Sequence, residues 1–217
     1  MPSALPAARP QAAPATVLTV ASIAGFAVLT VAVVTGVLRP LDADAREWAR
    51  PGGVWGPAQL RADLLVETLR PDRVVWLPVV VGVLQGVARR SVRPLLLVGL
   101  TVGLVSGLVV GLKEILATPD AHGDLTHGGS FPSGHTVSVL VASGLSVLLI
   151  RAHPPRWVWV IPAALVVGMG GSLMVEGAHW GSDVVGGALL GAALLCGLRA
   201  SGLVCWATRP GAATPGA

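Results

Sequence analysis

The sequence contains few of the charged residues with which a soluble domain covers its surface. Only 12% of its 217 residues are charged, and Lys113 is its single lysine. Hydrophobic residues make up 53% of the chain, and its mean hydropathy is +0.74. A soluble domain of this length needs far more polar surface. The composition therefore excludes the soluble globular class and indicates an integral membrane protein.

Cysteine is also scarce, and the basic residues are not concentrated in one place. Cys196 and Cys205 both lie in the last apolar run, where we expect them to pack; they indicate neither a disulfide framework nor a zinc site. The net charge of +4 suggests nucleic-acid binding, but the arginines are scattered in short segments between apolar runs. Charge that flanks membrane spans explains them better, and we expect no nucleic-acid partner.

The chain is rich in long apolar runs. The first, residues 16–38, has 23 residues; this suits a bilayer span and exceeds a typical signal-peptide core, with a cleaved signal anchor as the alternative. We expect an all-α, polytopic membrane helix bundle of about six transmembrane helices, with five or seven as alternatives, in one domain over residues 16–206. Residues 1–15 and 207–217 are expected to be disordered tails. The later runs are 74–88, 94–112, 136–150, 157–175 and 184–206.

A polar segment, residues 39–73, separates the first two apolar runs. Residues 41–50 and 60–70 have helical spacing and mixed charge, which predicts two helices near the membrane interface. Pro51–Gly53 should separate them, because proline and glycine interrupt helices.

The basic residues of the short loops predict the orientation of the chain in the membrane. The short loops on one side of the membrane carry arginines, whereas the short loops on the other side carry Lys113 alone. The long segment 39–73 contains six arginines and six acidic residues, which balance each other. Basic loops favour the cytoplasmic side, so we expect both termini in the cytoplasm and residues 113–135 and 176–183 outside. The arginines of the inner loops are Arg89, Arg90, Arg93, Arg151 and Arg156.

The motif Pro-Ser-Gly-His at residues 132–135 opens the fourth apolar run on this outer side. Ser133 is placed to cap the helix, and Gly134 lets a ligand approach the backbone. The N–H groups at a helix N-terminus bind anions such as phosphate, and His135 in the first turn can donate a proton to a leaving oxygen. An ordinary serine cap beside an incidental histidine is the alternative. We expect Phe131 to anchor at the membrane interface.

A second group of polar residues links the fifth and sixth runs. His179 and Asp183 are four residues apart, on one face of a helix. A carboxylate that binds one imidazole nitrogen leaves the other nitrogen as a nucleophile or base. The ammonium group of Lys113 suits a bound phosphate.

A zinc site is the alternative use of the histidines and acidic residues. The chain has no closely spaced pair of zinc-binding histidines, so we expect no metal. The possible zinc ligands are His122, Asp124, His127, His135, His179 and Asp183.

In their order and spacing these motifs resemble those of the type 2 phosphatidic acid phosphatase superfamily, which also contains the vanadium haloperoxidases. The match runs from Lys113 through residues 132–135 to Ser172, His179 and Asp183. The resemblance implies a six-span membrane fold with the motifs at the ends of spans three to six. It also implies a metal-independent enzyme, without a cofactor, that hydrolyses a phosphomonoester or diphosphate of a lipid; a haloperoxidase does not suit so apolar a chain.

The resemblance also implies a role for each matched residue. His179 attacks phosphorus to form a phosphohistidine, Asp183 steadies the imidazole, and His135 protonates the departing lipid alcohol. The implied partners are a lipid phosphate and the surrounding membrane lipids. The implied location is a cell membrane, with the active site on its extracytoplasmic face. The residues that hold the phosphoryl oxygens are then Lys113, Ser133, Gly134 and Ser172.

Two positions depart from the family's pattern. The family's two phosphate-binding arginines fall on Asp120 and Leu173, and neither side chain supplies a guanidinium fork. Each lost partner costs on the order of 1.5–3 kcal/mol of phosphate binding. The alternative function is therefore a catalytically weak or inactive relative that binds lipid phosphates; a small transporter is disfavoured because no broken-helix repeat is visible. Possible substitutes for the arginines are Arg70, Arg73, His122 and His127.

Overall fold

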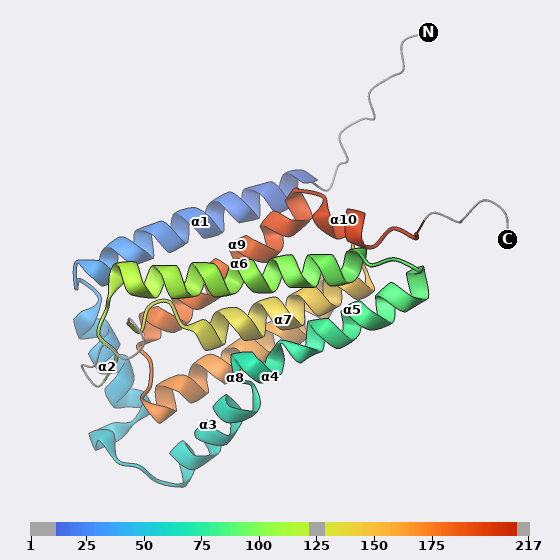
Figure 1. Cartoon of the computed structure of the whole chain (residues 1–217). Helices are drawn as coiled ribbons and strands as arrows, with labels where there is room; N and C mark the ends of the chain where they lie inside the picture. The colour runs from blue at the N-terminus through green and yellow to red at the C-terminus, as the bar shows by residue number, and fades with distance from the viewer. Residues whose placement is uncertain (1–11, 122–128, 212–217) are drawn as a thin grey trace, which may run out of the picture.

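Long helices dominate the protein and run side by side as a bundle (Figure 1). The computed structural model describes residues 12–121 and 129–211, and within these ranges it contains helices and no strand. This confirms the all-α bundle expected from the sequence. The long helices are α1 (Ala12–Val34), α5 (Trp76–Arg89), α6 (Arg93–Leu116), α7 (Gly134–Ile150), α8 (Val160–Glu176) and α9 (Gly181–Ala200).

Each of the six expected spans corresponds to one of these helices. Within the described residues, five candidate spans are long and apolar enough to cross a membrane, and α7, with 17 residues, is shorter. The α5 span includes the preceding short helix α4 (Pro71–Val74), and the α8 span includes the 3₁₀ turn η3 (Arg156–Trp159). Helix α7 packs against α5, α6, α8 and α9, so it forms the centre of the bundle.

The ends of the outer helices differ from the expected boundaries. Helix α1 begins at Ala12, inside the expected tail, and ends at Val34 rather than at residue 38. The last run is broken at Gly202, whose φ of 77° turns the chain before the short helix α10 (Leu203–Ala207). Residues 1–11 and 212–217 of the expected tails lie outside the described residues.

Two glycines on α9 allow that helix to approach α7 closely. A Cβ atom on Gly187 would lie 2.7 Å from the Ser133 carbonyl oxygen, and one on Gly191 would lie 3.0 Å from Leu140 Cδ2. Small residues one turn apart let the backbones of membrane helices meet in this way. The contact brings the beginnings of α7 and α9 together, and both functional motifs lie at these beginnings.

Phe131 does not anchor at the interface, so that expectation was wrong. Its side chain is fully buried, and its ring stacks on Phe26 with centroids 5.6 Å apart. Gly186 of α9 provides the space, because a Cβ atom there would collide with the ring. Phe131 thus packs the segment before α7 against α1 and α9.

The polar segment between the first two spans forms two helices, as expected. Helix α2 (Arg39–Ala49) contains no buried residue, and its Trp48 is 84% exposed. The turn η1 (Pro51–Gly53), with positive φ at both glycines, separates it from α3 (Pro57–Thr68), which packs on α8. Exposed tryptophan on such a helix suits a membrane interface.

Four helix ends meet at one end of the bundle, as the sequence predicted. There α6 and α8 end and α7 and α9 begin, beside α2 and α3. The first residue of α1 and the short α10 both lie at the opposite end (Figure 1). The polar motifs therefore share one end of the bundle, and both described chain ends lie at the other.

Candidate active site

Ser133 caps α7, which confirms the expected helix start. Its Oγ accepts hydrogen bonds from the Thr136 N–H at 3.4 Å and from Thr136 Oγ1 at 3.1 Å. Its own N–H donates to the Asp183 carbonyl oxygen at 3.0 Å, which ties the two motifs together. The Ser133 side chain is completely buried, so it shapes the helix start, whereas half-buried Gly134 and His135 form its accessible first turn.

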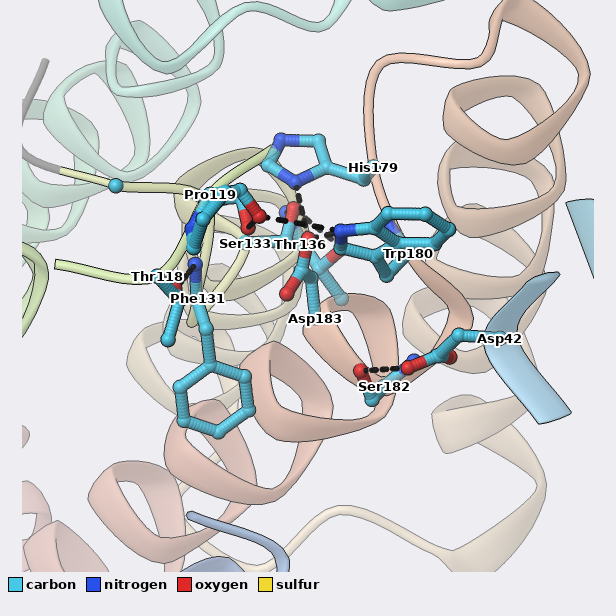
Figure 2. Close-up of polar contacts among 12 residues, drawn as sticks. Asp42, Thr118, Pro119, Phe131, Ser133, Thr136, His179, Trp180, Ser182 and Asp183 are labelled. Carbon is cyan, nitrogen blue, oxygen red and sulfur yellow. Dashed lines mark hydrogen bonds and ion pairs between the residues drawn. The ribbon is translucent and has the colours of Figure 1, made fainter. Parts of the chain in front are cut away.

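His179 and Asp183 form the pair that their spacing predicts (Figure 2). His179 Nδ1 donates to Asp183 Oδ2 at 3.1 Å, and the Trp180 N–H donates to the same oxygen at 3.0 Å. His179 precedes α9, which begins at Gly181, so the pair forms across the helix cap and not along a helical face. With the Asp183 side chain only 1% exposed, this buried carboxylate fixes Nδ1 as the protonated nitrogen and leaves Nε2 available.

The two histidines face one pocket. The ring centroids of His135 and His179 lie 6.3 Å apart, with the rings at 70° to each other. They line a pocket of about 600 Å³ between α3, α4, α7 and α8. The pocket is large enough to admit a phosphate group. Its other lining residues are Val66, Glu67, Arg70, Pro71, Asp72, Leu173, Glu176 and Ala178.

Lys113 and Ser172 are not among the described residues that line this pocket. Lys113 Nζ donates to the Gly129 carbonyl oxygen at 2.8 Å. The adjacent segment is fixed by two more bonds, from the Ser130 N–H to the Thr118 carbonyl at 2.9 Å and from the Phe131 N–H to Thr118 Oγ1 at 3.1 Å. In this structure the lysine therefore supports the chain that leads into Ser133.

The two positions that lack the family's arginines line different pockets. Leu173 is buried and lines the pocket of the two histidines. Asp120 lines a second pocket, of about 720 Å³, together with Asp42, Ser182 and Asp183. The two replaced arginines are therefore not equivalent, because only Leu173 lines the pocket that contains both imidazoles.

Of the proposed substitutes for those arginines, Arg70 lines the histidine pocket and Arg73 does not. His122 and His127 lie outside the described residues, as does Asp124. Within residues 12–121 and 129–211, no group of three or more histidine, cysteine or acidic side chains is arranged to hold a metal ion.

Sequence reasoning missed Asp42, which supports the beginning of α9. Its Oδ1 accepts from the Ser182 N–H at 2.9 Å and its Oδ2 from Ser182 Oγ at 2.7 Å (Figure 2). A carboxylate at a helix N-terminus is favourable for the helix dipole as well. Trp180 was missed too; its Nε1 donates to the Pro119 carbonyl oxygen at 3.1 Å. The mixed charge of residues 41–50 was the only signal for Asp42.

Replacing Asp42 by alanine should loosen the pair of His179 and Asp183 without removing either residue. Loss of the two bonds to Ser182 should lower the free energy of unfolding by about 1–3 kcal/mol, and turnover should fall roughly 10-fold because Asp183 is the next residue. Thermal unfolding and phosphate release measure the two effects. The matched control is Asp44→Ala on the exposed side of the same helix; equal behaviour of the two variants would contradict this role.

Known proteins resemble this chain in sequence and in fold. Residues 94–204, just over half of the chain, match the PAP2 superfamily. A stretch of 62 residues is 37% identical to an undecaprenyl-diphosphatase of Sulfolobus acidocaldarius, but it covers only 29% of this chain and 28% of that protein. The fold matches the crystal structure of a transmembrane PAP2-type phosphatidylglycerolphosphate phosphatase from Bacillus subtilis, with a TM-score of 0.68 and 23% identity, over 82% of this chain and 92% of that one. The chain belongs to the PAP2 superfamily.

Proposed function

We propose that this protein is a metal-independent lipid phosphatase that hydrolyses a phosphomonoester or diphosphate of a lipid through a phosphohistidine. The pair of imidazoles in one pocket carries the proposal. The ring centroids of His135 and His179 lie 6.3 Å apart, and Asp183 binds Nδ1 of His179. A phosphorus atom between the rings meets a nucleophile on one side and a proton donor on the other.

The reaction proceeds in two displacements at phosphorus. First, Nε2 of His179 bonds to phosphorus while the bond to the lipid oxygen breaks, and protonated His135 gives its proton to that oxygen. Water then attacks phosphorus, the phosphorus–nitrogen bond breaks, and His135 takes the proton from the water. Phosphate leaves and both histidines return to their starting states. Asp183 stabilises the positive charge that develops on the His179 ring.

The phosphoryl oxygens need fixed hydrogen-bond donors, since charge spreads over them in the transition state. The free N–H groups in the first turn of α7, at Gly134 and His135, are suitable donors because a helix N-terminus binds anions. Lys113 and Ser172 remain predicted contributors, and Ser133 acts by fixing this first turn. Lys113 gives one of its three N–H donors to the Gly129 carbonyl oxygen in this structure, which leaves two donors for a phosphate.

The orientation proposed for the chain places this site at the outer face of the membrane. The end of the bundle opposite the site carries Arg89, Arg90, Arg151 and Arg156, and basic residues favour the cytoplasm. Both termini are then cytoplasmic, and the lipid substrate lies in the outer leaflet beside α3 and α8.

A second candidate function, a weakly active or inactive protein that binds lipid phosphates, is favoured by the carboxylates of the pocket. Glu67, Asp72 and Glu176 line it with a single guanidinium, and Leu173 replaces a second one. Acidic side chains repel a phosphate dianion. This candidate differs from the first in its outcome, which is binding of the headgroup without turnover.

A phosphate-release panel over phosphatidic acid, phosphatidylglycerol phosphate and a polyprenyl diphosphate tests the proposal. Protein in chelator should release phosphate from at least one of them, and in right-side-out but not inside-out vesicles when the lipid is added from outside. Turnover that disappears in chelator and returns with a divalent cation contradicts the metal-independent chemistry. Binding without release at high protein concentration supports the second candidate.

A further inference from the structure

Arg70 is the single arginine or lysine among the described residues that line the histidine pocket. It lies between α3 and α4, immediately before Pro71, where the chain turns from the surface helix into the second span. Because α3 packs on α8 and α4 packs on α7, this turn is held against the two helices that carry Leu173 and His135. Arg70 thus reaches the pocket from a part of the chain outside the matched motifs.

Two carboxylates hold the guanidinium in place. Asp72 Oδ1 accepts from Nε at 3.2 Å, and Glu67 Oε1 accepts from Nη1 at 3.2 Å. Among the described residues, Nη2 has no such partner, so its N–H groups are available to a ligand. The carboxylates of Asp72 and Glu67 also raise the pKa of Arg70 above its usual range, and the group keeps its charge at every working pH.

The neighbouring Arg73 also interacts with Glu67, but it does not line the histidine pocket. Its Nη1 donates to the Glu67 carbonyl oxygen and its Nη2 lies 3.5 Å from Glu67 Oε2. It is about as exposed as Arg70, with 55% against 46% of the side chain accessible. It does not line the pocket. The two arginines therefore share a partner and a degree of exposure, and differ in access to the histidines.

We propose that Arg70 binds the phosphate of the substrate and takes over the task of the arginine that Leu173 replaces. The inference rests on the proposed function of the histidine pocket. A guanidinium presents two parallel donors to phosphate oxygens, which a leucine cannot do. Arg70 and Leu173 line the same pocket from different elements, so the arginine lost from α8 is compensated from the α3–α4 turn. Asp120, in the second pocket, is not compensated in this way.

The test compares Arg70→Gln with Arg73→Gln, with Arg70→Lys as a third variant. Two quantities are measured in detergent: the affinity for inorganic phosphate, by competition or calorimetry, and the KM and kcat for short-chain phosphatidic acid. Arg70→Gln should weaken phosphate binding and raise KM about 10-fold or more, and Arg73→Gln should stay within about 2-fold of wild type. Arg70→Lys should recover part of the loss, because it keeps the charge without the fork. Unchanged thermal unfolding of Arg70→Gln separates a ligand contact from a structural one.

Each outcome decides between this inference and the proposed function. If wild type turns over and Arg70→Gln matches Arg73→Gln, Arg70 is not a phosphate ligand and the phosphatase assignment stands. If wild type binds phosphate without turnover and Arg70→Gln loses that binding, Arg70 is the ligand and the assignment as an active enzyme is wrong. A wild-type protein that neither binds nor hydrolyses overturns both.

Discussion

Replacing His179 by alanine should reduce phosphate release by at least about 10³-fold. The substitution removes Nε2, the nitrogen that attacks phosphorus in the proposed mechanism, so the covalent route is lost entirely. Affinity for inorganic phosphate should change little, because the first turn of α7 and Arg70 remain. Initial rates of phosphate release from the best lipid of the panel, measured alongside phosphate affinity, separate the two effects.

His153→Ala is the matched control, since His153 lies in the loop between α7 and η3 at the opposite end of the bundle. It should keep wild-type rates. Thermal unfolding of both variants checks that the fold is kept, since His179→Ala loses the hydrogen bond to Asp183. Turnover by His179→Ala within 10-fold of wild type would mean that another group attacks phosphorus.

Asp183→Asn should lower kcat by about 10³-fold while KM stays nearly constant. The amide keeps the size of the carboxylate, and the Ser133 N–H binds the backbone carbonyl of residue 183, which the substitution leaves in place. What disappears is the negative charge that fixes the protonated nitrogen of His179 and stabilises the ring as positive charge develops. The effect therefore belongs to the chemical step, and steady-state kinetics should assign it to kcat.

Asp44→Asn, on the exposed side of α2, controls for the loss of one carboxylate at this end of the bundle. It should behave as wild type. If Asp183→Asn raises KM and leaves kcat intact, then Asp183 serves binding, and the role assigned to it in orienting His179 is wrong.

Local patterns in the sequence were sufficient to predict the local structure of the two motifs. Ser133 follows proline and precedes an apolar run, and this alone predicts the cap that the structure contains. The spacing of His179 and Asp183 predicts their contact, although the contact forms across a helix cap. Each of these predictions depends on residues at most four apart, whose geometry follows from the backbone.

Contacts between distant segments were beyond the reach of the sequence. Asp42 binds Ser182 across 140 positions, and no local pattern indicates which helix start an acidic residue will support. Arg70 and Arg73 lie three residues apart in the same polar segment, and only the folded structure shows that Arg70, and not Arg73, lines the pocket. Phe131 was misplaced for the same reason, since the space at Gly186 exists only once α9 lies beside α7.

The extent of the helices was also only partly predictable. Hydropathy marks the apolar run of α1, but backbone hydrogen bonding continues the helix into residues 12–15 and ends it at Val34. In the last run, apolar residues continue past Gly202 while the chain turns there. Hydropathy indicates which residues are apolar enough to lie in lipid. It does not indicate where the helix ends, which in the last run depends on the positive φ of Gly202.

The most direct test of the account is to trap the intermediate on His179. Wild-type protein in chelator is mixed with a lipid phosphate labelled with ³²P, quenched in alkali within the first turnover, and digested for peptide analysis. We expect a label that is stable in alkali, released by acid and located on the peptide that contains His179; His179→Ala should carry none. Phosphate release by wild type with no label on the protein, or with the label on another residue, would contradict it.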